Sequence, residues 1–243
     1  MDKDLRLALM AGIDLPIVEC RLVAHQPKIK EIAFLGDTSF FTGVQTLCLY
    51  KSMFTQGNVD LEDINNFQIF MTMMLEKETL DKKQSVLDVL KLLFPSYKVL
   101  LTPRSLIFQK EQSEPVMVDE NNFEALQEIL RLIFCANQGP MDQQAFNPAD
   151  DAAREIAEKL MRGRQRVAAQ KGNTNSSVFV RYLSVLSLAL NLPIQSLLEY
   201  TMFQFYDLIE RYGLWLNWDL DIRARLAGGK PDKHPDDWMK DIH

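Results

Sequence analysis

The sequence predicts a mainly α-helical protein: a helical bundle with a small β-meander in its N-terminal half as a minor α+β component. Apolar residues recur at steps of three and four in both halves of the chain, which places them on one face of a helix. Residues 192–229 hold the longest such stretch. Short runs rich in β-branched and aromatic residues gather between residues 96 and 119, separated by a proline and polar residues.

The N-terminal residues predict short elements. Residues 3–10 predict a short helix. Apolar and polar side chains alternate over residues 18–24, a pattern typical of a strand. Residues 28–36 fit either a helical turn or a second strand. Residues 37–54 predict a helix that the Asp, Thr or Ser at its start can cap.

Two amphipathic helices, a meander and a further helix follow. Residues 61–77 and 80–94 each carry apolar side chains at steps of three and four, with a tight turn between them. Residues 96–119 contain three short β-rich runs, which most simply form a small meander. Residues 121–134 return to the helical spacing after an Asp or Asn N-cap.

The second half of the chain predicts helices. Residues 147–172 begin with Asn as N-cap and Pro in the first turn, and their acidic residues come early and their basic residues late, as the helix dipole favours. Residues 178–191 are apolar on nearly every side, which is typical of a helix buried in the middle of a bundle. Asn191 fits the N-cap of a long helix through residues 192–229.

One apolar stripe organises that long helix. Its members recur at steps of four and three: Leu198, Met202, Phe205, Ile209, Tyr212 and Leu216. Towards the C-terminal end the apolar spacing also fits a strand. Two acid-before-base pairs four residues apart, Asp219 with Arg223 and Asp221 with Arg225, favour the helix.

Residues 136–148 contain Gly, Pro, Gln and Asn without any period, and the chain changes character after them. We therefore place a domain boundary here. The sequence predicts four parts: an N-terminal α+β domain (1–137), a linker (138–148), a C-terminal helical domain (149–229) and a polar tail (230–243).

Composition limits the class of protein. A formal net charge of -6 argues against a surface built as a whole for nucleic acid or anionic membranes. Three cysteines, far apart and without a CxxC pair, suggest neither a disulfide framework nor a zinc site, so a reducing cytoplasm fits best. The most apolar stretch starts at Val178, contains Arg181 and is shorter than the ~20 residues of a membrane span, so we expect no membrane association.

The sequence offers little for catalysis. It has three histidines without HxxxH spacing, and neither GxGxxG nor GxxxxGK[ST] occurs. The acids Asp219 and Asp221 could suggest a metal site, but the arginines four residues later are placed to neutralise them. We therefore expect a non-enzymatic protein with no catalytic residue, no metal site and no cofactor.

One basic stretch could grip phosphates. It comprises Lys159, Arg162, Arg164, Arg166 and Lys171. No aromatic residues interleave with these bases, and the acidic first half of the same predicted helix opposes a polyanion. A solvated helix face is therefore the favoured interpretation, and a nucleic-acid-binding module using residues 159–171 is the weaker alternative.

Three stretches of the C-terminal part carry a family resemblance: FNPADDAAREIAEKLMRGRQRVAAQKG, IQSLLEYTMFQFYDLIERYGLWLNWDLDIRARLAGGK and WMKDIH. From Phe146 to His243 the chain resembles phage and prophage proteins of Gram-positive hosts, similar to tail-assembly chaperones encoded just before the tape measure. The resemblance implies a protein of the infected cell's cytoplasm that binds the tape-measure protein and keeps it soluble until tail-tube subunits polymerise around it.

The resemblance also implies partners: the tape-measure protein, with the tail-tube protein as a further candidate, and a homo-oligomer. Candidate partner-binding residues are Met202, Phe205, Ile209, Tyr212, Trp215 and Trp218. The β-rich run and the length of the chain depart from the compact chaperones of this group. A structural component of the virion, in the tail or baseplate, therefore stays open as an alternative.

Overall fold

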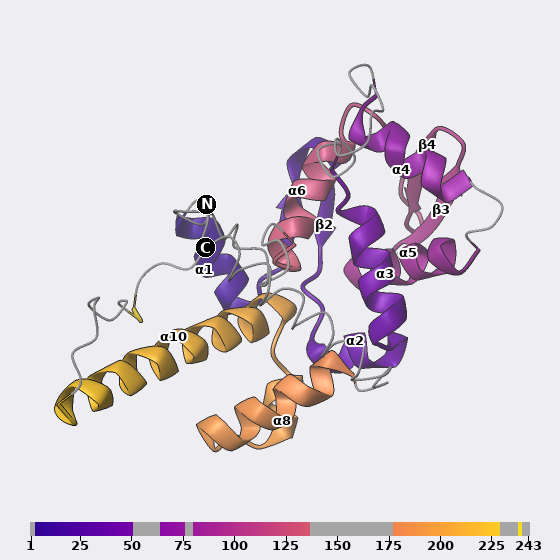
Figure 1. Ribbon diagram of the computed structural model, residues 1–243. Helices are drawn as coiled ribbons and strands as arrows, with labels where there is room; N and C mark the ends of the chain where they lie inside the picture. The colour runs from indigo at the N-terminus through magenta and orange to yellow at the C-terminus, as the bar shows by residue number, and fades with distance from the viewer. Residues whose placement is uncertain (1–2, 51–63, 76–79, 137–176, 229–237, 240–243) are drawn as a thin grey trace, which may run out of the picture.

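The computed structural model describes residues 3–50, 64–75, 80–136, 177–228 and 238–239 (Figure 1). The described helices are α1 (Lys3–Ala11), α2 (Ile29–Leu35), α3 (Asp37–Leu47), α4 (Asn66–Leu75), α5 (Leu80–Leu93), α6 (Phe123–Ile133), α8 (Val178–Leu190), α9 (Ile194–Leu198) and α10 (Met202–Leu226), with a 3₁₀ turn, η1 (Val18–Cys20). The strands are β1 (Leu15–Ile17), β2 (Leu22–Ala24), β3 (Lys98–Thr102), β4 (Ser105–Gln109) and β5 (Val116–Val118). The predicted fold class, mainly helical with minor β-structure in the N-terminal half, is confirmed.

The predicted meander forms from the three β-rich runs. Strands β3, β4 and β5 are antiparallel neighbours in that order. Leu106, Phe108 and Val118 are fully buried and share the inner face of this sheet. The outer face carries a row of apolar side chains across the three strands, Leu100 opposite Ile107 and Ile107 opposite Met117.

Residues 18–24 do not form the single strand that their alternation predicts. Strands β1 and β2 pair as an antiparallel hairpin, and η1 fills the connection, with Arg21 in the left-handed region at φ 51°. A hairpin that buries the same face of both strands produces the same alternation of apolar and polar residues as one longer strand. For residues 28–36 the sequence allows either a helical turn or a second strand, and the structure has helix α2 there. Its Glu31 side chain accepts a hydrogen bond from the Lys28 backbone N–H at 2.7 Å.

The N-terminal core is built around the contact of α3 with α5. These two helices pack together more extensively than any other pair in the described ranges. A glycine on α3, Gly43, allows the approach, because a Cβ atom there would collide with the Ser85 backbone oxygen and lie 2.6 Å from a Val89 methyl group. Phe40, one turn earlier on α3, lies with its ring 5.4 Å from that of Phe134.

The C-terminal helices join this same core. Phe179 on α8 stacks on Phe41, with ring centroids 5.4 Å apart and planes at 7°, and lies 6.2 Å from Phe205 on α10. Figure 1 shows α8 and α10 together at the bottom of the view, below the sheets and helices α3, α4, α5 and α6. The predicted linker, residues 138–148, and the predicted helix that follows it lie outside the described residues, so that domain boundary stays a prediction.

The predicted long helix over 192–229 is two helices, α9 and α10. Asn191 does not cap its start: it adopts φ 51° and ends α8 as the C-cap. Thr201 is the N-cap of α10, and its hydroxyl accepts a hydrogen bond from the Gln204 backbone N–H. Asn is common at helix N-caps and also in the left-handed conformation that ends a helix. An Asn in the sequence therefore does not show by itself whether a helix begins or ends there. The helix that the sequence favoured beyond residue 213 is confirmed.

Gly43→Ala should destabilise the protein by about 1–3 kcal/mol, because α3 and α5 would have to move apart to accept the methyl group. Gly213→Ala on α10 is the matched control, since its added Cβ atom meets nothing within 4 Å. That change should stabilise by about 0.5–1 kcal/mol through helix propensity. Urea unfolding followed by circular dichroism measures both, and equal effects at the two sites would contradict the packing assignment.

The three free thiols should react slowly with a thiol reagent in the folded protein. Burial raises the pKa of Cys20 to about 11, and of Cys48 and Cys135 to about 12, from an ordinary value of 9.0. At about pH 8 the thiolate that reacts is therefore scarce until urea unfolds the chain. Because the folded chain holds these protons more tightly, stability should fall as the pH rises from 9.0 towards 12. Ellman titration with and without urea checks the reactivity, and rapid labelling of all three cysteines in buffer would contradict it.

Candidate interaction surface

The first turns of α10 are fixed to the N-terminal part of the chain. Thr201 and Gln204 form a reciprocal capping box, in which Gln204 Oε1 accepts from the Thr201 backbone N–H at 2.8 Å. The same Gln204 side chain donates to the Met10 carbonyl oxygen at 2.7 Å, which ties α10 to α1. Lys28 and Lys30 both contact Glu199, just before α10, at 2.9 and 2.6 Å. The proximal half of α10 is thus anchored by several independent contacts.

Burial on α10 changes along its length. Met202, Phe203 and Phe205 are each 2% exposed and belong to the core. Asp207 is also buried, and one of its carboxylate oxygens lies 3.8 Å from Arg6 and 3.9 Å from Arg211. Because a carboxylate is costly to bury without partners, these two arginines make that position tolerable. The first two turns therefore act mainly as an anchor, with their large apolar side chains in the core.

The distal half of α10 carries exposed apolar side chains. They are Trp215 (39% exposed), Leu216 (37%), Leu220 (55%) and Leu226 (83%). Figure 1 shows this half of α10 leaving the body of the molecule. Asp219 bonds Arg223 at 2.8 Å and Asp221 lies 3.4 Å from Arg225, so the pairs that favoured a helix in the sequence are confirmed. These pairs support an exposed helix locally while its leucines stay uncovered.

The six candidate partner-binding residues do not share one surface. Met202 and Phe205 are buried, and Ile209 and Tyr212 pack half-buried against the core. Trp215 is exposed, with its ring 5.9 Å from that of Tyr212, and Trp218 is half-exposed. A single stripe at helical spacing therefore begins as core and continues as surface. Of the six, Trp215 and Trp218 are the best placed to meet a partner.

The sequence of α8 predicts a helix buried in the middle of a bundle. In the structure, one side of α8 is exposed. Phe179, Leu183 and Leu186 face the core, whereas the other side of the helix is exposed. The exposed apolar residues of α8 are Val178, Val180, Tyr182, Val185 and Leu188, of which Leu188 is 87% exposed. Apolar residues all round a helix show only that each side favours burial, and they do not say whether this chain or another covers it.

We call the exposed apolar residues of α8 and of distal α10 the C-terminal apolar surface. It comprises Val178, Val180, Tyr182, Val185, Leu188, Trp215, Leu216, Leu220 and Leu226. The α8 residues were not predicted from the sequence as part of a surface, although apolar residues on nearly every side of that helix were the signal that could have indicated them. The two helices also meet in the core, where the rings of Phe179 on α8 and Phe205 on α10 lie 6.2 Å apart.

Within the described residues, no cluster of three or more His, Cys, Asp or Glu residues could hold a metal ion. His25 is held by two carboxylates, Asp14 at 2.9 Å and Glu31 at 3.4 Å, which suits a structural role between β2 and α2. Among the described helices, none has the length and apolar character that crossing a membrane requires. The candidate basic patch, residues 159–171, lies outside the described ranges.

Comparison with known proteins points to phages. Residues 177–243 match the family model described as the YomV second domain, a phage-derived domain family. The match begins one residue before α8 and contains α8, α9 and α10, so it includes the whole C-terminal apolar surface. No curated protein and no solved structure matches the chain. The C-terminal helices are thus similar to a phage-associated domain.

Anchor and surface residues of α10 should differ sharply in stability measurements. Phe205→Ala should cost about 3–5 kcal/mol, because it leaves a cavity beside Phe179. Leu220→Ala should change the stability by no more than about 0.5 kcal/mol, since the side chain is already in solvent. Urea denaturation midpoints at equal m-values measure both. A large loss for Leu220→Ala would show that this residue is covered in the free protein.

Proposed function

We propose that this protein is a non-enzymatic phage morphogenesis protein, a tail-assembly chaperone that binds the tape-measure protein through the C-terminal apolar surface. The observation that carries the proposal is the exposure of Trp215, Leu220 and Leu188 on helices that match a phage-derived domain family. A monomer seldom leaves so many large apolar side chains uncovered without a partner for them.

The chemistry of this surface suits a helical apolar client. Side chains from two neighbouring helices can receive the apolar face of an amphipathic helix, the mode in which anchors are spaced by three and four residues. Trp215 supplies a large anchor of the type that dominates binding energy at interfaces. Asp219 and Asp221 already form ion pairs with arginines. The polar side of α10 next to the apolar surface therefore places little unpaired charge beside an uncharged client.

A chaperone of this kind also covers its own apolar surface before the client arrives. The same residues can meet a second copy, so we propose a homo-oligomer in the host cytoplasm that the client displaces or joins. Binding a long client at several sites at once would strengthen a modest contact through effective concentration. The tail-tube protein is a further candidate partner, because it polymerises around the same client.

Capture of the tape-measure protein tests the proposal. Leu220→Asp and Val185→Asp should each lower its recovery with the tagged chain from infected cells by about tenfold or more, because a carboxylate would be buried without a partner. Val23→Asp, at a 52% exposed residue of β2, is the matched control and should leave recovery unchanged. Unchanged recovery with both C-terminal variants would refute the assignment of this surface.

Mass spectrometry of purified particles distinguishes a chaperone from a virion component. A chaperone acts in the cytoplasm and should be absent from finished particles. A stoichiometric amount of the chain in tails or baseplates would instead establish the structural alternative, and the apolar surface would then be a permanent interface.

A further inference from the structure

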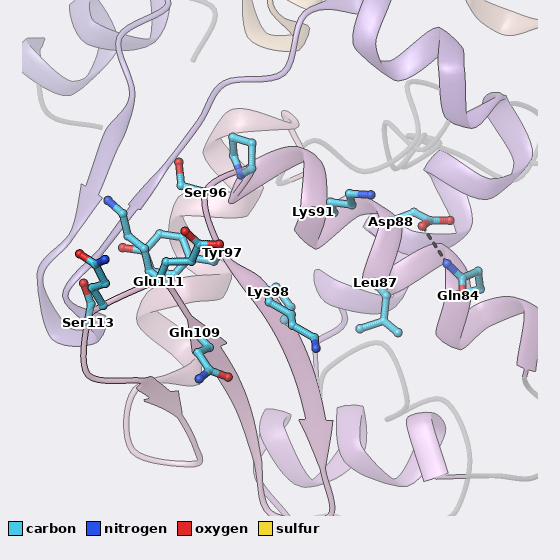
Figure 2. A pocket seen from close by; sticks show the side chains of 14 residues that line it. Gln84, Leu87, Asp88, Lys91, Ser96, Tyr97, Lys98, Gln109, Glu111 and Ser113 are labelled. Carbon is cyan, nitrogen blue, oxygen red and sulfur yellow. Dashed lines mark hydrogen bonds between the residues drawn. The ribbon is translucent and has the colours of Figure 1, made fainter.

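A second surface, with different chemistry, lies on the N-terminal part of the chain. A cleft of about 1160 Å³ opens between α5 and the meander (Figure 2). One exposed side of α5, the turn that leads into β3, and the end of β4 line it. Its lining includes one leucine, three lysines and two acids: Leu87, Lys91, Lys98, Lys110, Asp88 and Glu111. This surface is separate from α8 and α10 and is independent of the proposed function.

The cleft meets the start of a free sheet edge, since Lys98 and Val99 of β3 line it. In the described residues β3 pairs with β4 on one side and with no strand on the other. Figure 2 shows Leu87 of α5 and Lys98 of β3 pointing into the space between the two elements. In an antiparallel pair, alternate residues of an edge strand direct their backbone N–H and C=O groups away from the partner. The edge of β3, which begins at the cleft and continues beyond it, therefore presents peptide groups suited to another extended chain.

The side chains that line the cleft carry a net positive charge, whereas the whole chain has a net negative charge. Lys91, Lys98 and Lys110 line it, and none of them takes part in an ion pair within the described residues. Of the two acids at the cleft, Asp88 accepts a hydrogen bond from Gln84 at 2.8 Å. Glu111 is the other acid. With three lysines and two acids, the cleft carries a net charge of +1 in a chain of net charge -6, and this local excess favours an acidic ligand.

We propose that the cleft binds an acidic, extended segment of a partner protein, which adds to the free edge of β3 as a further strand. Main-chain hydrogen bonds to β3 would supply affinity, and carboxylates meeting the three lysines would supply selectivity. Alternate side chains of the added strand would contact Leu87 and Leu100, the latter 39% exposed at the end of the outer apolar row.

Charge decides between this occupant and two others. A second copy of the chain would bring its own lysines against these, and like charges at a sheet edge oppose pairing. Nucleic acid would use the lysines but leave the peptide groups of β3 unmatched, and the overall charge of -6 opposes a polyanion. An acidic polypeptide satisfies both the lysines and the strand edge.

Fluorescence anisotropy of the full chain with one defined probe tests the proposal. The probe is a labelled peptide of about eight residues in which Glu alternates with Thr, long enough to span an edge strand. It should bind, and the double variant Lys91→Glu with Lys98→Glu should weaken binding by about tenfold or more. Lys82→Glu is the matched control: it is exposed on the same helix, does not line the cleft and should have no effect.

Hydrogen exchange adds a readout that a merely electrostatic contact would not change. Saturating probe should slow amide exchange in β3, because added-strand hydrogen bonds protect those groups. Binding without that protection, equal binding of a peptide with Lys in place of Glu, or equal weakening by Lys82→Glu would each overturn the proposal. So would tighter binding of a single-stranded oligonucleotide at the same lysines. Absence of binding at about 1 mM probe would also refute it.

Discussion

The contacts of Phe179 with other phenylalanine rings join the C-terminal helices to the N-terminal part of the chain. Its ring stacks on Phe41, lies 5.9 Å from Phe40 and lies 6.2 Å from Phe205. These four rings come from α3, α8 and α10, which are far apart in sequence. Because aromatic side chains bury large apolar areas, this cluster fixes one side of α8 and the start of α10 against the N-terminal core. This attachment helps to determine which faces of α8 and α10 remain in solvent.

Polar contacts set the ends of the same elements. The capping box at Thr201 starts α10, and the bond from Gln204 to the Met10 carbonyl oxygen orients it. Inside the N-terminal part, Gln127 donates to the carbonyl oxygens of Leu47 and Leu49, where α3 ends. Arg131 lies over the Tyr50 ring at 3.4 Å, and burial lowers the pKa of its guanidinium. Such bonds contribute little net stability each, but an unmade one is costly, so they select a single arrangement.

This packing leaves two exposed surfaces that differ in their chemistry. The C-terminal apolar surface gathers leucine, valine, tyrosine and tryptophan side chains on helices, whereas the cleft beside β3 offers lysines and peptide groups. An apolar helix suits the first and an acidic strand suits the second. A protein with both could hold two different segments at once, one through desolvation and the other through charge and main-chain pairing. The match to a phage-derived domain covers only the first of the two.

Local signals in the sequence determined much of the secondary structure. Helical spacing located α5, α6 and α10, the β-rich runs located the meander, and the pairs from Asp219 and Asp221 kept the end of α10 helical. All of these depend on residues within a few positions of one another. Tertiary structure alone decided that Asn191 ends a helix, that η1 turns the first strands into a hairpin, and that α8 is covered on one side only. It also decided that Met202 and Phe205 are core while Trp215 is surface, because burial depends on which distant element arrives at a face, and hydrophobic spacing records only that a face favours burial.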